Sequence, residues 1–244
     1  MQVQADRLNI TANNLANINT RGYKREVVNV KSFDEVLINA MQFNVSERGK
    51  ALGSVSFGNS IDEKRFVFDQ GFMEQTGFKT DLAIRGDGFF ILSTPNGETQ
   101  YSRSGNFTFD QDGYLISQEG YYVMGQQGRI QIPNKKIHVD LKGVVNTEDG
   151  EGNYIRVDQI AIADVNDTKA LFKLPSGYYT TNANNIKAPG KIDIMQSFLE
   201  SSNVSIVEET REMMDAKRNF ESCQQVIKML DDVMGKASSE IGKL

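Results

Sequence analysis

The stretch NVSIVEETREMMDAKRNFESCQQVIKMLDDVMGKASSEIGKL, residues 203–244, decides the fold of this chain. Its apolar residues recur at alternating spacings of three and four over four heptads, the pattern of a helix that buries a narrow seam against another helix. The seam residues are Met213, Ala216, Phe220, Cys223, Ile227, Leu230, Met234, Ala237 and Ile241. At ~1.5 Å per residue such a helix would reach about 60 Å, more than a compact domain needs. We therefore expect it to lie against something equally long; one long helix of an ordinary bundle is the simplest alternative.

The N-terminal stretch has the same spacing and is the expected partner. Met1, Ala5, Leu8, Ala12 and Leu15 form its apolar stripe, and Gly22 is expected to end the helix. The polar face carries uncharged amides at Asn9, Asn13, Asn14 and Asn17. Amides suit a helix that meets protein on several sides, because burying charges costs far more. Residues 1–31 carry a net charge of +3 and residues 203–244 a net charge of −2, which favours pairing of the two ends.

Composition places the chain among soluble proteins and excludes several classes. With 244 residues the chain can bury a core, as one large domain or two modest ones. The net charge of −5 argues against nucleic acid as a partner, because that needs a basic footprint. No apolar run approaches the ~20 residues of a membrane span, and the start lacks the layout of a secretory signal. The single cysteine, Cys223, excludes an internal disulfide.

The middle of the chain is predicted to be antiparallel β-structure. Short alternating or apolar runs are separated by turn signals, among them Asn96-Gly97 and Asp112-Gly113. The expected strands lie near residues 66–68, 82–84, 89–92, 99–102, 107–109, 114–116, 121–124, 130–132, 157–163 and 192–194. Residues 23–31 are expected to be a polar link, residues 32–43 a short amphipathic helix that begins with a capping box, and residues 182–189 an irregular loop.

These patterns predict an α+β fold with a discontinuous organisation. The N- and C-terminal helices, paired as a coiled-coil-like domain, would comprise residues 1–50 plus 191–244 with their linker. An all-β antiparallel domain, residues 51–190, would be inserted between them. Two terminal seams of this kind suit a subunit that must assemble better than they suit a soluble enzyme.

The residues that commonly carry chemistry are sparse. His138 is the only histidine and lies in a strand-like run, so we expect it to be structural. One histidine and one cysteine exclude zinc sites built on imidazole and thiolate. Gly86-Asp87-Gly88 lacks a third glycine and opens no helix, so it is interpreted as a turn.

Acidic residues in the middle of the chain give no better site. Asp110 and Asp112 resemble the start of a calcium loop, but position twelve counted from Asp110 is Tyr121 instead of Glu. Asp164 and Asp167 would be candidates for a glycosidase pair only at a suitable separation, which sequence does not show. We therefore predict no enzymatic activity, no catalytic residues, no cofactor and no metal.

Several motifs then resemble one family. Residues 13–25, NNLANINTRGYKR, resemble the N-terminal signature of bacterial flagellar axial proteins, the subunits of rod and hook. Residues 81–90, DLAIRGDGFF, resemble the opening of their β-domain, and residues 101–107 and 112–115 resemble its continuation. Residues 200–204, 207–209, 218–221 and 227–231 are similar to the C-terminal pattern of the family. Within it the chain is similar to the FlgG- and FlgF-like basal-body rod proteins, and it is too short for a typical hook protein.

The resemblance implies a structural subunit of the flagellar basal-body rod. Such a subunit is exported unfolded by the type III apparatus and assembles helically with many copies of itself. Its terminal helices would form an inner tube around a channel, its β-domain would face outward, and the rod would transmit torque from motor to hook for motility. Implied partners are other rod and hook proteins, the export apparatus, and the ring or bushing proteins of the envelope, where the rod is located.

The chain departs from the family at a few positions. Typical members carry further residues before the position of Met1, so this chain is expected to begin inside the first helix. Lys217 and Cys223 stand where the family tends to have polar amides. Neither residue upsets the seam, so the interpretation is unchanged.

The predicted assembly interface combines both ends of the chain. Its residues are Leu8, Ala12, Leu15, Asn13, Asn14 and Asn17 from the N-terminal helix and Met213, Phe220, Cys223, Ile227, Leu230 and Met234 from the C-terminal helix. One alternative is a flagellar hook or hook-junction subunit. Another, of a different class, is a cell-envelope carbohydrate-binding or hydrolytic β-domain on a helical oligomerisation stalk. Its candidate sugar-stacking rings are Tyr121, Tyr122, Tyr178 and Tyr179.

Overall fold

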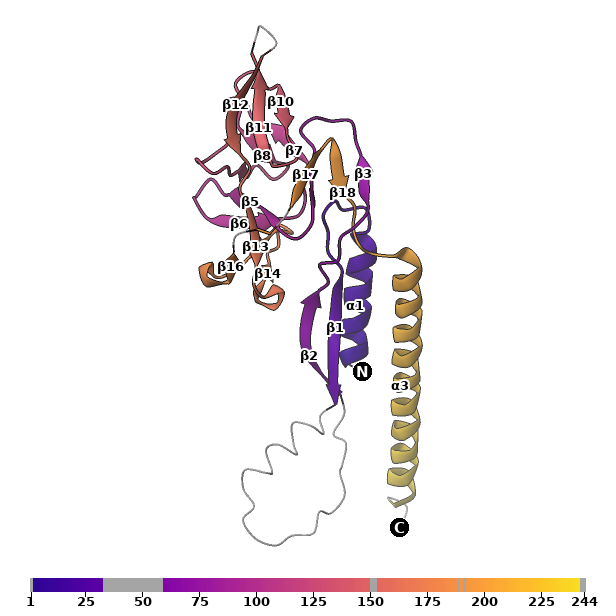
Figure 1. Ribbon diagram of the computed structural model, residues 1–244. Coiled ribbons are helices and arrows are strands. Elements are labelled where there is room, and N and C mark those ends of the chain that lie inside the picture. Colours follow the sequence, from indigo (N-terminus) through magenta and orange to yellow (C-terminus); the bar gives the residue numbers. More distant parts are fainter. Residues whose placement is uncertain (1, 33–58, 150–152, 188, 191, 242–244) are drawn as a thin grey trace, which may run out of the picture. The chain divides into compact units, whose positions relative to one another are not determined.

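The computed structural model describes residues 2–32, 59–149, 153–187, 189–190 and 192–241 (Figure 1). The chain divides into two compact units, each discontinuous in sequence. Unit 1 is formed by Met1–Ala16, Glu26–Arg65 and Ser205–Leu244, and unit 2 by Asn17–Arg25 and Phe66–Val204. Helices and antiparallel strands occur together, which confirms the mixed α and β class. The predicted division at residues 50/51 and 190/191 stays a prediction.

Unit 1 contains both α-helices of the described residues. α1 spans Gln2–Ala16 and α3 spans Ile206–Ile241, and α1 contacts α3. The single long C-terminal helix is confirmed. The expected end of the first helix at Gly22 is wrong, because α1 ends at Ala16 and a turn follows, in which the Thr20 N–H donates to the Asn17 carbonyl at 3.1 Å. The physical reason is that asparagine and β-branched side chains after Ala16 favour turns over helix.

Unit 1 also holds a two-stranded sheet of β1, Glu26–Ser32, and β2, Asn59–Phe66. The prediction of a polar link over residues 23–31 is therefore wrong for most of its length. Val27, Val28 and Val30 are β-branched, and they outweigh the charged residues around them. Ser32, the expected start of a short helix, ends β1, and the rest of that predicted helix lies outside the described residues.

Unit 2 is built from short strands, and every pairing between them is antiparallel. The strands are β3 (Met73–Gln75), β4 (Leu82–Arg85), β5 (Phe89–Ser93), β6 (Thr99–Ser102), β7 (Phe107–Phe109), β8 (Leu115–Ser117), β9 (Tyr122–Val123), β10 (Ile137–Val139), β11 (Val144–Glu148), β12 (Tyr154–Gln159), β13 (Ile162–Val165), β14 (Phe172–Lys173), β15 (Tyr179–Thr180), β16 (Ile186–Lys187), β17 (Asp193–Gln196) and β18 (Phe198–Glu200). The largest sheet runs β14-β15-β6-β5-β9-β8-β7, with β13 joined to β5 and to β16. β10-β11-β12, β17-β4 and β18-β3 form smaller sheets.

The turn signals predicted the hairpins of unit 2. Asn96-Gly97 lies between β5 and β6, where Ser93 pairs with Thr99, and the Thr94 N–H donates to the Glu98 carbonyl at 2.9 Å. Asp112-Gly113 connects β7 to β8, and Gly113 has a φ of +81°, which glycine adopts without strain. The hydrophobic core collects inward residues of these strands, including Leu82, Phe90 and Leu115.

Four expectations need correction. The strand expected near residues 66–68 is wrong beyond Phe66, because β2 ends there and residues 67 and 68 lie outside any strand. Among residues 130–132 only Gln131 forms an isolated bridge, to Tyr114, although Ile130 and Ile132 are fully buried. The run 157–163 is divided between β12 and β13 instead of forming one strand, and residues 182–189 include a short 3₁₀ helix, Ala183–Asn185, followed by β16. Apolar content alone does not tell a strand from a buried loop, because both fill the core equally well.

Candidate assembly interface

The predicted seam on α3 is buried in its first half only. Ala216 is buried, and Met213, Phe220 and Cys223 are partly buried, whereas Ile227, Leu230 and Met234 are exposed. α1 has 15 residues and α3 has 36, so at ~1.5 Å per residue α1 reaches about 22 Å along a helix of about 54 Å. Within one subunit α1 therefore covers less than half of α3.

The buried face of α1 is offset from its predicted apolar stripe. Ile10, Thr11 and Asn14 are buried, whereas Leu8 and Leu15 are partly buried. Of the remaining predicted interface residues, Ala12 and Asn13 are exposed, and Asn17 belongs to unit 2 and is partly buried. The buried face of α1 therefore includes the polar residues Thr11 and Asn14 as well as the aliphatic Ile10.

Asn14 shows why an amide lies on this inward face. Its Nδ2 donates to the Glu26 carbonyl at 2.8 Å, and its Oδ1 accepts from the Glu26 N–H at 3.0 Å. Nδ2 also donates to the carboxylate of Glu209 on α3 at 3.1 Å. Asn14 and Glu209 are each 1% exposed, so these bonds provide the partners that buried polar groups need. One amide therefore connects α1, β1 and α3.

In unit 2 the two terminal motifs meet at a buried ion cluster around Glu200. The Lys24 Nζ lies 2.7 Å from Oε1 of Glu200, and the Arg103 Nε lies 2.7 Å from Oε2. The Gly71 N–H also donates to Oε1 at 2.8 Å, and Lys24 donates to the Asp69 carbonyl at 2.9 Å. Lys24 and Glu200 are 1% and 2% exposed. A single carboxylate thus compensates two buried cations.

The remaining donors of Arg103 are also engaged. Its guanidinium donates to the carbonyls of Gly86 and Gly88, both of which have positive φ angles. The Gly86-Asp87-Gly88 turn expected from the sequence therefore presents carbonyls to an arginine. Burial lowers the pKa of the Lys24 ammonium below its ordinary value, and the Glu200 carboxylate opposes that shift.

Asn203 connects the segments around the Glu200 cluster through its side-chain amide. It accepts from the Arg25 N–H at 2.7 Å and donates to the carbonyls of Val67 and Asp69 at 2.8 and 3.1 Å. The Gly22 N–H donates to the Glu200 carbonyl at 2.8 Å. The N-terminal motif and the C-terminal motif are therefore one structural element of unit 2, completed by residues 67–71.

The sequence patterns assign no role to these three charged residues. Lys24 and Arg103 stand inside motifs that resemble the family, but they are separated from Glu200 by 176 and 97 residues. No periodicity relates positions so far apart, and a lysine or glutamate is most often a surface residue. The one available signal is their place inside motifs that resemble the family.

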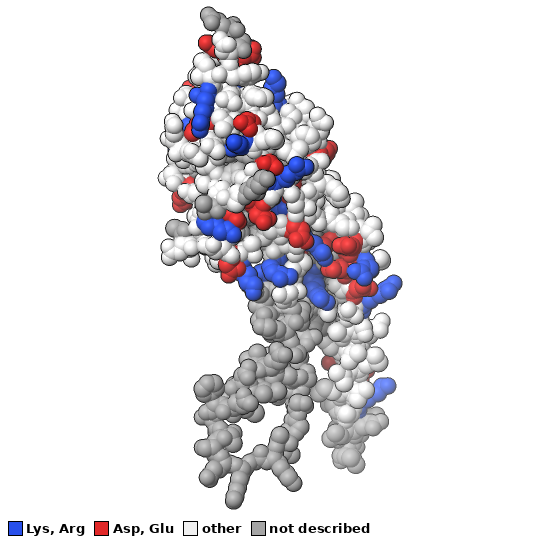
Figure 2. Space-filling view, viewed as in Figure 1, with Lys and Arg blue, Asp and Glu red and all other residues white. Residues whose placement is uncertain are grey.

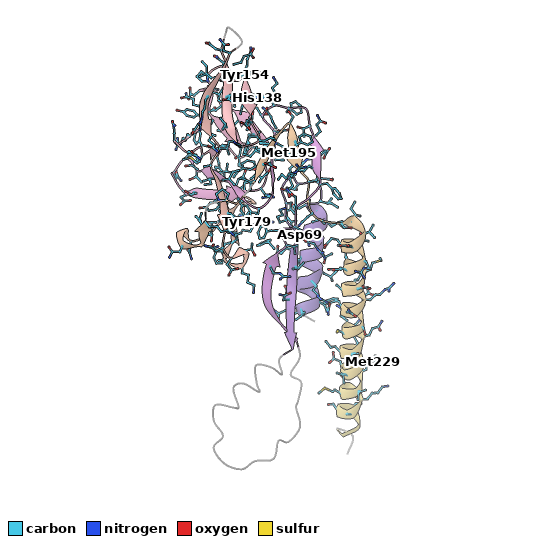
Figure 3. The ribbon with its side chains drawn as sticks, in the orientation of Figure 1. Asp69, His138, Tyr154, Tyr179, Met195 and Met229 are labelled. Atoms are coloured by element: carbon cyan, nitrogen blue, oxygen red, sulfur yellow. The ribbon has the colours of Figure 1, made fainter. Side chains whose placement is uncertain are left out.

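The four tyrosines considered for sugar stacking pack against other side chains of unit 2. Tyr178 and Tyr179 are buried, and the ring of Tyr121 lies 5.3 Å from that of Tyr178. Tyr122 packs against Tyr114 at 5.6 Å and lies under the guanidinium of Arg129. Figure 3 labels Tyr179, which lies among the side chains of unit 2. Tyr121 and Tyr122 are partly buried.

The carboxylates considered for catalysis have structural partners. Asp164 forms an ion pair with Lys187 at 3.1 Å, and Asp167 accepts from the Lys169 N–H at the start of a 3₁₀ turn. A cavity of about 240 Å³ lies beside the cluster, lined by Lys24, Arg103, Lys187 and Asp164 among others. Within the part of the chain that the structure describes, no group of His, Cys, Asp and Glu is arranged to hold a metal ion.

Two further observations concern exposed surfaces. His138 is exposed on β10, and its ring lies 5.1 Å from that of Tyr154. Figure 3 labels both residues. Basic and acidic side chains are interspersed on the face seen in Figure 2, without a basic footprint. None of the described helices is long and apolar enough to cross a membrane.

Three family models match this chain, in the same order as the sequence motifs described above. Residues 1–24 match the flagella basal body rod protein family, residues 83–151 match the FlgE/F/G D1 domain of flagellar hook proteins, and residues 195–240 match the C-terminal region of basal body rod FlgEFG proteins. The chain is 31% identical to the basal-body rod protein FlgG of Bacillus subtilis over 240 residues, which cover 93% of this chain and 90% of that protein. The chain belongs to the flagellar basal-body rod protein family.

Other members of the family and one hook protein are also similar. FlgG of Agrobacterium fabrum is 30% identical over 262 residues, covering 99% of this chain and 96% of that protein. The flagellar hook protein FlgE of Helicobacter mustelae is 39% identical over 131 residues, which are 51% of this chain but only 28% of that protein. The Asn14 contacts and the Lys24–Glu200–Arg103 cluster lie in the segments that resemble this family.

Proposed function

We infer that this chain is a structural subunit of the flagellar basal-body rod, exported from the cytoplasm and located in the basal body. The observation that carries this conclusion is the similarity to FlgG rod proteins over nearly the whole of both chains. The family is a structural one, and no described feature favours a second, catalytic function. The hook alternative is weaker, because the similarity to a hook protein covers only 28% of that protein.

The subunits assemble with one another through the terminal helices. The exposed apolar residues Ile227, Leu230 and Met234 support this, because surfaces of that kind mark interaction sites. In the polymer the α1 and α3 seams pack as a coiled-coil-like layer that forms the inner tube of the rod, and the β-domain faces outward. The interface uses the predicted residues that the subunit leaves exposed, among them Ala12 and Asn13 of α1. The rod carries torque from motor to hook.

Export and partners follow from the same arrangement. A helix of 15 residues is marginal alone in water, so α1 and the distal part of α3 gain most of their stability when neighbours arrive. This coupling keeps the subunit exportable through the type III apparatus before it assembles. The partners are copies of this chain, other rod and hook proteins, and the ring proteins of the envelope through which the rod passes.

The test compares two aspartate variants of one helix in cells that depend on this protein for motility. Leu230→Asp places a charge on the seam, whereas Met214→Asp changes another exposed apolar residue of α3 that lies off the seam. We expect Leu230→Asp to be absent from purified basal bodies and Met214→Asp to be present. Normal rods with Leu230→Asp would contradict the seam, and absence of the unmodified protein from basal bodies would contradict the function.

A further inference from the structure

Unit 2 contains a cavity of about 240 Å³ beside the Glu200 cluster. All the residues that line it belong to this unit, so the cavity is complete within one subunit. The rod assembly proposed above uses the terminal helices of unit 1 and leaves the cavity without a role. A hollow of this kind that combines apolar walls with a few charged groups is a candidate ligand site.

The buried side of the cavity carries an excess of positive charge. Lys24 and Arg103 both line it, and they are 1% and 5% exposed. Among the described residues, Glu200 is the one carboxylate that forms an ion pair with either of them, and Glu200 is not a lining residue. Two positive charges against one negative charge leave a balance of +1. A buried charge without a partner is costly, so this side of the cavity favours an anion.

Lys24 also keeps a hydrogen-bond donor for such an anion. An ammonium group has three N–H donors. Within the described part of the chain Lys24 has two acceptors, the carboxylate of Glu200 and the carbonyl of Asp69, a residue labelled in Figure 3. Burial lowers the pKa of the Lys24 ammonium, which reflects the cost of holding its charge away from water. An anion in the cavity would offset that cost.

Two aromatic rings give the cavity an apolar wall. Phe68 and Phe89 line it, and their rings pack edge to face with centroids 5.4 Å apart. Tyr179, which Figure 3 labels, packs against both rings at 5.6 and 5.8 Å. Because the rings are already fixed, a ligand that packs against them orders few side chains on binding. A cavity of about 150 Å³ is enough for benzene, so this one has room for a ring and a carboxylate.

Two carboxylates also line the cavity, but neither neutralises its buried side. Asp164 is paired with Lys187, another lining residue, at 3.1 Å. Asp87 is exposed, so water weakens the field of its charge. The acidic groups therefore leave the positive balance around Lys24 and Arg103 in place.

We propose that this cavity binds a small organic carboxylate with an apolar ring or branched chain as its body. The carboxylate accepts a hydrogen bond from Lys24 and lies beside Arg103, while the apolar body packs against Phe68 and Phe89. Such a ligand compensates the buried positive charge, and it stabilises folded unit 2 by mass action. The site lies within unit 2, so it does not depend on rod assembly.

Three ligands that share a ring and differ in charge test the proposal. Benzoate, benzamide and benzylamine are titrated into the dilute full-length chain, and binding is followed by saturation-transfer NMR of the ligand. We expect benzoate to bind at least about tenfold more tightly than the other two, because a carboxylate forms a charge-assisted hydrogen bond with Lys24. Equal binding of benzamide, tighter binding of benzylamine or no binding of benzoate would each overturn the proposal.

Two tryptophan substitutions locate the bound benzoate. Thr168 is exposed and lines the cavity, so Thr168→Trp places an indole where the ligand would lie. Asn166 is exposed two residues earlier and is not a lining residue, so Asn166→Trp is the matched control. We expect Thr168→Trp to weaken benzoate binding at least about tenfold and the control to leave it unchanged. Equal affinities of both variants and the unmodified chain would place benzoate elsewhere and overturn the assignment.

Lys24→Met tests whether the buried charge selects the carboxylate. It leaves Arg103 and Glu200 as a balanced pair, so benzoate should lose its advantage over benzamide. Circular dichroism checks that the variant is folded. A preference for benzoate that persists in folded Lys24→Met would overturn the role of this charge. Thr168→Trp leaves the ion cluster intact, so it decides the location whether or not Lys24→Met folds.

Discussion

Replacing Glu200 by glutamine should destabilise unit 2 more than any surface change. Glu200→Gln keeps the size of the side chain but removes the one carboxylate that contacts both Lys24 and Arg103. Removing one member of a buried ion pair costs about 3–5 kcal/mol, because it leaves an uncompensated buried charge. Set against a total stability of about 5–15 kcal/mol for a typical domain, that loss is a large share.

Urea unfolding of the dilute full-length chain measures the effect. The chain has no tryptophan, and buried tyrosines such as Tyr101 and Tyr179 report on unit 2 through fluorescence and near-ultraviolet circular dichroism. Glu74→Gln is the control, because Glu74 forms an exposed ion pair with Arg21 and its loss should change stability little. A Glu200→Gln midpoint equal to that of the control would refute the reasoning.

Two additions make this test sharper. Lys24→Met in the Glu200→Gln background removes one uncompensated cation, so it should recover part of the lost stability. Burial lowers the pKa of Lys24, and without Glu200 the largest opposing influence disappears. Between that lowered pKa and the ordinary value of 10.5, the unfolded chain binds more protons than the folded one. The stability of Glu200→Gln should therefore rise as the pH increases within this window.

Three other predictions concern single residues. Asn14→Asp would bring a second carboxylate against Glu209 and remove an amide donor. The N–H groups of β1 should then exchange hydrogen at least about tenfold faster, as measured by mass spectrometry. Unchanged exchange would contradict the role of this amide. Gly22→Ala should lower the unfolding midpoint of unit 2, because a Cβ at this position would lie 2.4 Å from the backbone nitrogen of Ser104 and the φ of Gly22 is +69°. A midpoint equal to that of the unmodified protein would argue against this close approach. Burial raises the pKa of the Tyr178 phenol above its ordinary value of 10.0. The stability that the neutral phenol contributes is therefore fully present below pH 10 and is lost as the pH rises through the raised pKa. In an alkaline titration, Tyr178→Phe should lose less stability than the unmodified chain.

The sequence was sufficient where local patterns decide the structure. The 3.5-residue period predicted α3 over nearly its whole length, and Asn96-Gly97 and Asp112-Gly113 predicted two hairpins of unit 2. These features depend on residues close in the chain, for which spacing and turn chemistry are reliable. The motifs were also sufficient to place the chain in its family, since they occur in the same order as in the relatives.

Elements whose conformation depends on distant partners were missed. The polar residues around β1 predict a link, because the pairing with β2 that makes this segment a strand joins positions more than twenty residues apart. The end of α1 at Ala16 and the inward position of Asn14 follow from contacts with Glu26 and Glu209. A pattern in the first twenty residues holds no information about those partners.

The sequence by itself determined that this chain has a long apolar-seamed helix, an antiparallel β region and the motifs of a rod subunit. Only the tertiary structure decided that Lys24, Arg103 and Glu200 share one buried site and that the seam of α3 is covered for only part of its length. The physical reason is range. Helix periodicity and turn propensity act over a few residues, whereas charge compensation and burial depend on which distant segments the fold brings together.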